Sequence, residues 1–316
     1  MNNTSLVYKT LKLIRIRQWI KNLAVFAAIV FTGQLFNPDI FKNVVFAFFA
    51  FCMLSSTVYV INDIFDIEKD RLHPFKRFRP LANGDISLSF AIVVALVLFI
   101  ATVFLSLFVN EAFLLLVFTY LALQISYSAV LKHIEVLDIL VLAAGYIFRV
   151  YAGELASGYH ISVWLVLTTV SLSLFLAVGK RRNELTLISG FPQKHIEATR
   201  HTLSHYSERL LDVYASIFVA STFIFYTLFT FLENPGGFKI SLSILMPDFL
   251  PDYFQRKWLM ITIIPVVYGL MRYLQDIYEK HEGESPEKVI LSDIPLLTAV
   301  FLWTILVVVI IYFIKG

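Results

Sequence analysis

Long runs of apolar residues constrain the fold of this chain more than any other feature of its sequence. A transmembrane helix needs roughly 20 predominantly apolar residues. Nine candidate runs cover 22–36, 42–61, 88–108, 112–130, 137–156, 162–179, 210–232, 258–274 and 295–314. Their continuity excludes the strands of a membrane barrel, which alternate apolar and polar residues. We therefore predict an all-α integral membrane protein with nine transmembrane helices, forming one polytopic domain over 1–316.

The distribution of cations predicts the orientation of these spans. Loops on the cytoplasmic side of a membrane carry an excess of Lys and Arg. If the N-terminus is cytoplasmic, most of the 26 Lys and Arg residues fall on that side, and the C-terminus is outside. Three long segments on the cytoplasmic side then hold most of the polar residues, and we expect the active-site loops there: 62–87, 180–209 and 275–294. The segment 233–257 is expected outside, along the membrane interface.

The stretch NDIFDIEKD, residues 62–70, presents carboxylates directly after an apolar run. Asp63, Asp66 and Asp70 follow helical spacing, so a continuous helix places them on one face together with Asn62. Carboxylates packed together repel one another unless a cation lies between them. Mg²⁺ commonly uses one or two carboxylates and completes its shell with water and phosphate oxygens. We predict a Mg²⁺ site made by these four residues, for a metal-bound diphosphate.

The next stretch, HPFKRFRPLANG at 73–84, supplies cations in place of acids. Pro74 and Pro80 bracket Lys76, Arg77 and Arg79, which favours a fixed loop over a mobile basic tail. Phosphate groups are bound by arginine forks and lysine charges held at defined positions. Carboxylates for a metal beside cations for phosphate together indicate a diphosphate site.

Both halves of this segment also have simpler interpretations. The acids could form an ordinary solvated helix end that Lys69 and Arg71 neutralise. The cations could be determinants of membrane topology, or contacts to anionic lipid. Ionisable groups that emerge directly from a buried span are usually functional, and this position favours the site.

Other polar residues on the predicted cytoplasmic side extend this pattern. Candidates for substrate binding are Arg17 and Lys21 in RIRQWIKN, Tyr127 and Lys132 in YSAVLKH, and Lys180 and Arg181 in GKRRNE. Arg149 lies inside the fifth run, where an isolated charge is costly in lipid, so it should face the bundle interior and meet an anion. Glu154 is a candidate partner, and a purely structural ion pair is the alternative.

The chain resembles the UbiA superfamily of intramembrane prenyltransferases. The pattern NDxxDxxxD at 62–70 is similar to the first aspartate-rich motif of that superfamily, and nine spans with a cytoplasmic N-terminus match its fold. Further segments resemble the branch of decaprenyl-phosphate phosphoribosyltransferases and extend over nearly the whole chain. They are HPFKRFRPLANG, RIRQWIKN, YSAVLK, GKRRNE, YSERLL at 206–211, and MRYL with EGESPEKVILSD within 271–293.

The resemblance implies a reaction, a cofactor and a location. A transferase of this branch moves 5-phosphoribose from phosphoribosyl diphosphate (PRPP) to a polyprenyl phosphate and releases pyrophosphate, with Mg²⁺ as cofactor. It implies a bacterial inner membrane, an active site facing the cytoplasm and a role in cell envelope biosynthesis. One departure supports the branch: where many relatives carry a second aspartate-rich motif, this chain has Lys180, Arg181 and Arg182. A smaller departure is Ile16, where proline is expected.

On this basis each candidate residue receives an expected role. Asp63, Asp66 and Lys132 are expected to be catalytic, and Asn62, Asp63, Asp66 and Asp70 to hold the metal. The ribose 5-phosphate is assigned either to Lys76, Arg77 and Arg79 or to Lys180 and Arg181. The acceptor phosphate is assigned to Lys21, Lys132 or Arg149, with Arg17 and Tyr127 as further substrate ligands.

Two other functions remain open from the sequence. A related enzyme could use the same first motif to transfer a prenyl group from prenyl diphosphate to an aromatic acceptor. A transporter or lipid carrier is the more distant alternative, but such folds often show inverted repeats and broken helices near the bilayer midplane. The sequence has no convincing repeat, and its polar residues collect at the predicted cytoplasmic face. We expect no nucleic-acid partner, and the oligomeric state stays open.

Overall fold

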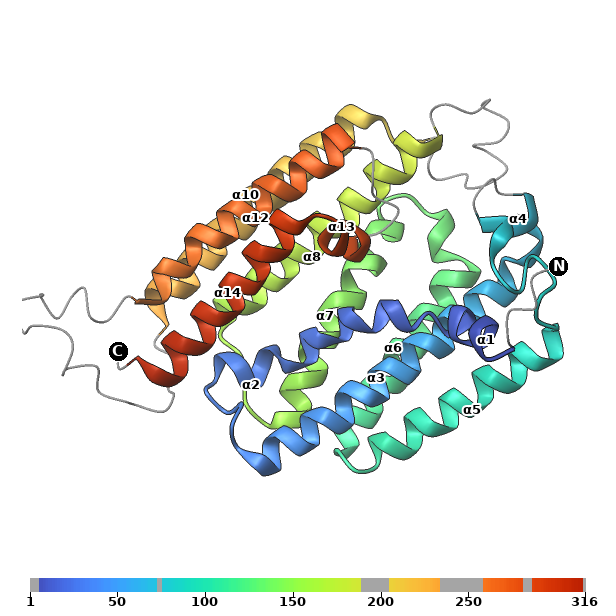
Figure 1. Ribbon diagram of the computed structural model, residues 1–316, viewed down its shortest axis with the longest axis horizontal. Helices are drawn as coiled ribbons and strands as arrows, with labels where there is room; N and C mark the ends of the chain where they lie inside the picture. Colours follow the sequence, from blue (N-terminus) through green and yellow to red (C-terminus); the bar gives the residue numbers. More distant parts are fainter. Residues whose placement is uncertain (1–5, 73–75, 189–204, 234–257, 281–285, 315–316) are drawn as a thin grey trace, which may run out of the picture.

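The computed structural model describes residues 6–72, 76–188, 205–233, 258–280 and 286–314, almost all of them helical (Figure 1). The elements are α1 (Leu6–Ile14), η1 (Ile16–Phe26), α2 (Ala27–Phe31), α3 (Pro38–Phe65), α4 (Ile67–Leu72), η2 (Lys76–Phe78), α5 (Leu88–Ser106), α6 (Glu111–Ala129), η3 (Leu131–His133), α7 (Leu137–Ser157), α8 (Val163–Ile188), α10 (Glu208–Leu232), η6 (Trp258–Thr262), α12 (Ile263–Gln275), the π-helical η7 (Asp276–Lys280), α13 (Pro286–Ser292) and α14 (Ile294–Phe313). Parts of all three predicted active-site loops, and nearly all of the predicted outside segment 233–257, lie outside the described residues.

Eight of the described helices are long and apolar enough to cross a membrane. The exception among the predicted spans is 22–36, where the chain instead forms the 3₁₀-helical η1 followed by the short α2. These two elements lead from the α1 end of the molecule toward the opposite end, beside α7 (Figure 1). The protein is therefore an all-helical membrane protein, while the count of nine spans and the orientation of the termini stay predictions.

Short polar side chains begin five of the long helices. The free backbone N–H groups of a helix's first turn need acceptors, which Ser, Asn and Asp side chains provide. These caps are Asn37 for α3, Ser87 for α5, Asn110 for α6, Ser207 for α10 and Asp293 for α14. In these five helices, the local sequence therefore determines the residue at which the helix begins.

Helix α7 lies at the centre of the bundle (Figure 1). Its residues enter all three large clusters of buried apolar side chains: Ala152 packs with α3 and α6, Ala143 with α8 and α10, and Val150 with α2 and α14. By contrast, α5 packs on α3 and leaves a row of apolar side chains such as Ile92, Leu96 and Ile100 more than half exposed. Apolar surface of this extent fits a helix whose outer face contacts lipid.

The packing of α7 against η1 depends on the absence of a side chain at Gly153. A Cβ atom built on this residue would lie 1.8 Å from the carbonyl oxygen of Val25. Small residues let backbones approach closely in membrane helix pairs. This contact fixes the position of η1, whose first residues lie beside the polar end of α3 and contact it through Gln18 and Trp19.

Candidate active site

The acidic motif lies at the end of α3, where the helix breaks. α3 ends at Phe65, Asp66 is its C-cap residue, and α4 begins at Ile67. The predicted single helix is thus interrupted at Asp66: Asp63 and Asp70 share one arginine as their partner, whereas Asp66 pairs with a lysine of another element. Each carboxylate instead pairs with a basic side chain, as the repulsion among like charges demands.

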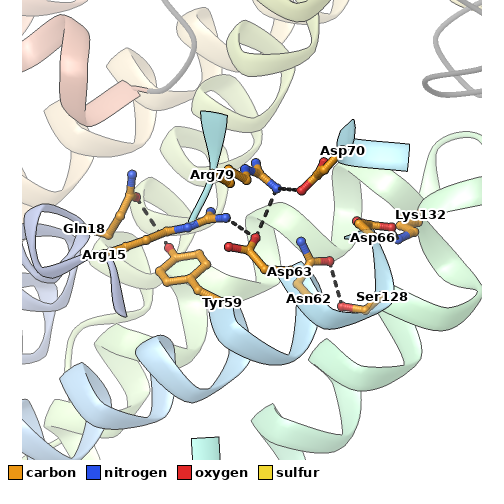
Figure 2. Close-up of polar contacts among 10 residues, drawn as sticks. All are labelled: Arg15, Gln18, Tyr59, Asn62, Asp63, Asp66, Asp70, Arg79, Ser128 and Lys132. Atoms are coloured by element: carbon orange, nitrogen blue, oxygen red, sulfur yellow. Dashed lines mark hydrogen bonds and ion pairs between the residues drawn. The ribbon is translucent and has the colours of Figure 1, made fainter. Parts of the chain in front are cut away.

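Asp63 and Asp70 meet at the guanidinium group of Arg79 (Figure 2). Arg79 Nη1 lies 3.1 Å from Asp63 Oδ1 and 2.6 Å from Asp70 Oδ2. Arg15 donates a second hydrogen bond to the same oxygen of Asp63. Both carboxylates are buried, and burial raises the pKa of Asp70, an effect that Arg79 partly offsets. Two cations thus compensate two buried acids.

Asp66 and Asn62 face helix α6 instead (Figure 2). Lys132 Nζ lies 2.6 Å from Asp66 Oδ1, and Ser128 Oγ donates to Asn62 Oδ1 at 3.1 Å. Lys132 follows the last turn of α6, where η3 replaces the α-helix and brings the lysine inward until it is buried. The simpler interpretation, with Lys69 and Arg71 as the neutralising cations, is wrong: Lys69 is exposed, and Arg71 Nε donates to the carbonyl of Ala82.

The chemistry of this set of oxygen donors fits Mg²⁺. Carboxylate and amide oxygens are hard ligands of the kind that Mg²⁺ takes, usually with water and substrate phosphate. Among the described residues, no group of three His, Cys, Asp or Glu side chains is already arranged to hold a metal ion. The basic side chains Arg15, Arg79 and Lys132 occupy the positions around the carboxylates. A metal would therefore have to displace cations from the acids.

The remaining predicted ligands on the N-terminal half lie at various distances from this cluster. Lys76 is half-buried near Asp70, and its charge offsets part of the rise that burial causes in the pKa of that carboxyl. Arg77 is exposed, and its guanidinium lies 4.8 Å from the ring centroid of Phe78. Arg17 is exposed and Lys21 half-buried, both on η1. Nothing in the described contacts brings Arg17 or Arg77 to the carboxylates.

A second cluster of charges lies beside the first and surrounds Arg181. This guanidinium is fully buried and forms ion pairs with the carboxylates of Asp138 and Glu184. It also donates a hydrogen bond to the hydroxyl of Tyr127 at 2.9 Å. The Tyr206 hydroxyl donates to Asp138 at 2.7 Å, and burial raises the pKa of this phenol. Tyr127 and Ser128 are consecutive residues of α6, and they contact Arg181 and Asn62 respectively. The end of α6 therefore lies between the two clusters and borders both.

Arg182 and Lys180 flank this buried arginine on α8. Arg182 binds Asp212 at 2.9 Å and Glu208 at 3.0 Å, and Tyr278 also donates to Asp212. Lys180 is half-buried. The acids Glu208 and Asp212 thus form ion pairs that join α10 to α8, and the hydrogen bond from Tyr278 joins η7 to the same group.

Arg149 faces the bundle interior, as predicted, but meets neutral groups. Its guanidinium donates to Asn22 Oδ1 at 2.7 Å, to the carbonyl of Gly145 and to Tyr120. Glu154, the candidate partner, binds His160 instead. Within the part of the chain that the structure describes, Arg149 forms no ion pair.

Several residues that the structure places in these clusters were not among the predicted site residues, and Arg15, Ser128 and Asp138 are examples. Arg15 lies in RIRQWIKN and Ser128 in YSAVLKH, so both stand next to predicted ligands. Asp138 is the first acid after a short loop, directly at the start of α7. The sequence around these residues does not indicate which helices they contact, because their partners lie far away in the sequence.

Known proteins resemble this chain over most of its length. Residues 23–246 match the UbiA prenyltransferase family. Decaprenyl-phosphate phosphoribosyltransferase from Mycolicibacterium smegmatis is 33% identical, covering 92% of this chain and 88% of its own length. The enzyme of the same name from Corynebacterium glutamicum is 31% identical over 96% and 86%.

A solved structure supports the fold independently. The UbiA homologue from Archaeoglobus fulgidus bound to DMAPP and Mg²⁺ superposes with a TM-score of 0.67, at 18% identity, over 96% of this chain and 99% of that one. At this identity the likeness concerns the fold alone. The family match and the relatives that are similar over most of the sequence show that the chain is a membrane-integral transferase that belongs to the UbiA prenyltransferase family.

Proposed function

We propose that this protein transfers 5-phosphoribose from PRPP to a polyprenyl phosphate and releases pyrophosphate. The observation that carries the proposal is the cluster at the end of α3, where Asp63, Asp66 and Asp70 are each paired with a basic residue. A metal diphosphate brings both a cation for the acids and anions for the bases. The relatives named decaprenyl-phosphate phosphoribosyltransferase, which are similar over most of the chain, support 5-phosphoribose as the transferred group.

The acids and Arg79 would bind the reacting diphosphate. Asp63 and Asp70 would hold Mg²⁺ with Asn62 and Asp66, since these residues present the oxygen donors that the ion prefers. When bound, Mg²⁺ stabilises negative charge on the leaving pyrophosphate. Once Arg79 is released from the carboxylates, it can donate to the oxygens of the leaving pyrophosphate. The negative charge that develops on this group then meets hydrogen-bond donors that are already in place.

The loop that carries Arg79 also offers cations for the ribose 5-phosphate. Lys76 and Arg77 belong to the same short segment, η2, and Arg77 is exposed. Arg181 is less suited to this role, because two carboxylates and Tyr127 already surround its buried guanidinium. We therefore assign the 5-phosphate to Lys76 and Arg77, with Lys180 at the edge of the site.

Lys132 would orient the acceptor phosphate beside the metal. Its ammonium group lies 2.6 Å from Asp66 Oδ1, at the boundary between the acidic cluster and α6. The attacking oxygen of a polyprenyl phosphate is already anionic, so its attack on ribose C1 requires no strong general base. Lys21 and Arg17 on η1 remain candidates for the lipid phosphate. Arg149 keeps its hydrogen bonds to neutral groups and would stabilise the bundle.

The proposal includes the topology and the location of the enzyme. The N-terminus would lie in the cytoplasm, η1 with α2 would form the first of nine crossings, and the C-terminus would lie outside. The acidic cluster would then face the cytoplasmic side of a bacterial inner membrane, where a soluble, highly charged donor is accessible. The polyprenyl tail would remain in the lipid beside the helices.

The test uses purified protein in nanodiscs with Mg²⁺, radiolabelled PRPP and a set of polyprenyl phosphates. We expect label in the organic phase, lost with EDTA. Asp66→Ala should lower kcat/KM at least about 100-fold, the scale for removing stabilisation of developing charge. Asp39→Ala, an exposed acid at the opposite end of α3, is the matched control and should keep wild-type activity.

Two results would contradict the proposal. Normal turnover by Asp66→Ala would remove the acidic cluster from the site. The absence of lipid-bound label, together with Mg²⁺-dependent pyrophosphate release from a prenyl diphosphate, would assign the protein to prenyl transfer instead.

A further inference from the structure

Arg15 has an unusual backbone conformation at the junction between α1 and η1. Its φ of 54° and ψ of 51° are left-handed. Residues other than glycine rarely adopt positive φ, and such residues cluster at functional sites, where surrounding contacts hold them. The conformation separates two helical elements, and the side chain at this junction reaches Asp63 on α3 (Figure 2).

Contacts on both sides hold Arg15 in place. Lys9 Nζ lies 2.9 Å from Asp85 Oδ1, and Lys12 Nζ donates to the carbonyl of Phe78 at 3.1 Å, so α1 is fastened to the loop that carries Arg79. The Arg15 guanidinium also lies 4.8 Å from the ring centroid of Tyr59. A cation over an aromatic face is stabilised without giving up its hydrogen-bond donors.

The charge balance at Asp63 points to a role for this contact. Asp63 is 2% exposed, yet it receives two guanidinium groups, those of Arg15 and Arg79, on the same oxygen. Arg79 also pairs with Asp70, so Asp63 retains one cation if Arg15 leaves. The Arg15 side chain is 23% exposed and is therefore partly accessible to a ligand.

We propose that Arg15 is an internal counter-ion that competes with the metal for Asp63 and transfers to the diphosphate when a metal diphosphate binds. The inference rests on the proposed function only in taking a metal-bound diphosphate as the ligand. A guanidinium group suits both states, because its planar fork matches carboxylate and phosphate oxygens alike. Arg15 thus keeps the buried acid neutralised until the ligand arrives, and then donates to the phosphate oxygens of the ligand.

If Arg15 exchanges partners in this way, one substitution should raise the affinity for the metal and lower the affinity for the diphosphate. Arg15→Gln removes a competitor of the metal at Asp63, so Mn²⁺ alone should bind about fivefold more tightly, the equivalent of one ion pair. The same substitution removes a charged donor for the diphosphate, so pyrophosphate should bind at least about tenfold more weakly in the presence of Mn²⁺. A purely structural role for Arg15 would weaken both.

The experiment measures Mn²⁺ binding by electron paramagnetic resonance and pyrophosphate binding by calorimetry, on the full chain in nanodiscs. Lys42→Gln is the control, because it removes the same charge from an exposed position near the start of α3, at the opposite end of the helix from Asp63. It should leave both affinities within about twofold of wild type, because an exposed charge this far from the acids is screened by solvent and salt. Since neither probe is PRPP, a failure of phosphoribosyl transfer does not alter this test.

Unchanged or weaker Mn²⁺ binding by Arg15→Gln would overturn the proposal, as would unchanged pyrophosphate binding. If Arg15→Gln does not fold, Arg15→Lys provides a second test of the proposal. Lysine keeps the charge but lacks the fork, so Mn²⁺ affinity should stay close to wild type while pyrophosphate affinity falls. Pyrophosphate affinity equal to wild type in Arg15→Lys would also overturn it.

Discussion

Gly153 offers a direct test of how the fold supports the candidate site. A Cβ atom on this residue would lie 1.8 Å from the Val25 carbonyl oxygen, whereas ordinary contacts begin at 3.4 Å. Gly153→Ala therefore requires α7 and η1 to separate by about 1.6 Å (3.4 − 1.8). The obstacle is backbone, so we expect a cost near the upper end for overpacked cores, about 3 kcal/mol.

Gly145 on the same helix is the matched control. A Cβ atom there would lie 3.5 Å from Arg149 Nη1 and 3.6 Å from Gln124 Nε2, which are ordinary contacts. Gly145→Ala should be neutral or stabilising by about 0.5–1 kcal/mol, because alanine loses less backbone entropy in a helix.

Cys52 provides the assay for both variants. It is the single cysteine of the chain and is fully buried against Asn22 of η1, so a fluorogenic maleimide reports its exposure on unfolding. We expect Gly153→Ala to react at a midpoint about 6 °C or more below wild type, at about 2–4 °C per kcal/mol. A midpoint equal to that of Gly145→Ala would refute the argument that this close contact positions η1.

Two further predictions concern the charged clusters. Burial raises the pKa of Asp70 above its ordinary value of 3.8, and a metal binds the ionised form; Mn²⁺ affinity should therefore be full above the raised pKa and fall as the pH drops through it. Asp70→Asn should remove that component of the pH profile, and an unchanged profile would exclude Asp70 as a ligand. Arg181→Met should lower stability by about 3–5 kcal/mol, because it leaves the buried carboxylate of Asp138 without its cation. Adding Asp138→Asn should recover part of this loss in thermal unfolding, and no recovery would contradict the buried ion pair.

The positions of the long apolar helices could be predicted because lipid leaves few alternatives. Backbone polar groups in a bilayer must be satisfied within the segment, so a long apolar run has to be helical. The predicted spans 88–108 and 112–130 correspond to α5, Leu88–Ser106, and α6, Glu111–Ala129. The first run, 22–36, departs from this rule, because the polar contacts of Trp19 and Asn22 with α3 support a 3₁₀ segment.

The sequence by itself determined that this chain is a helical membrane protein whose acids and bases collect beside the ends of its spans. Only the tertiary structure decided which charges meet. Asp63 and Asp66 pair with Arg15 and Lys132, 48 and 66 residues away, and not with their neighbours Lys69 and Arg71. Helical periodicity sets side-chain directions only within one element. The break at Asp66 and the close approach of η1 to α7 then turned these groups toward partners that no local pattern identifies.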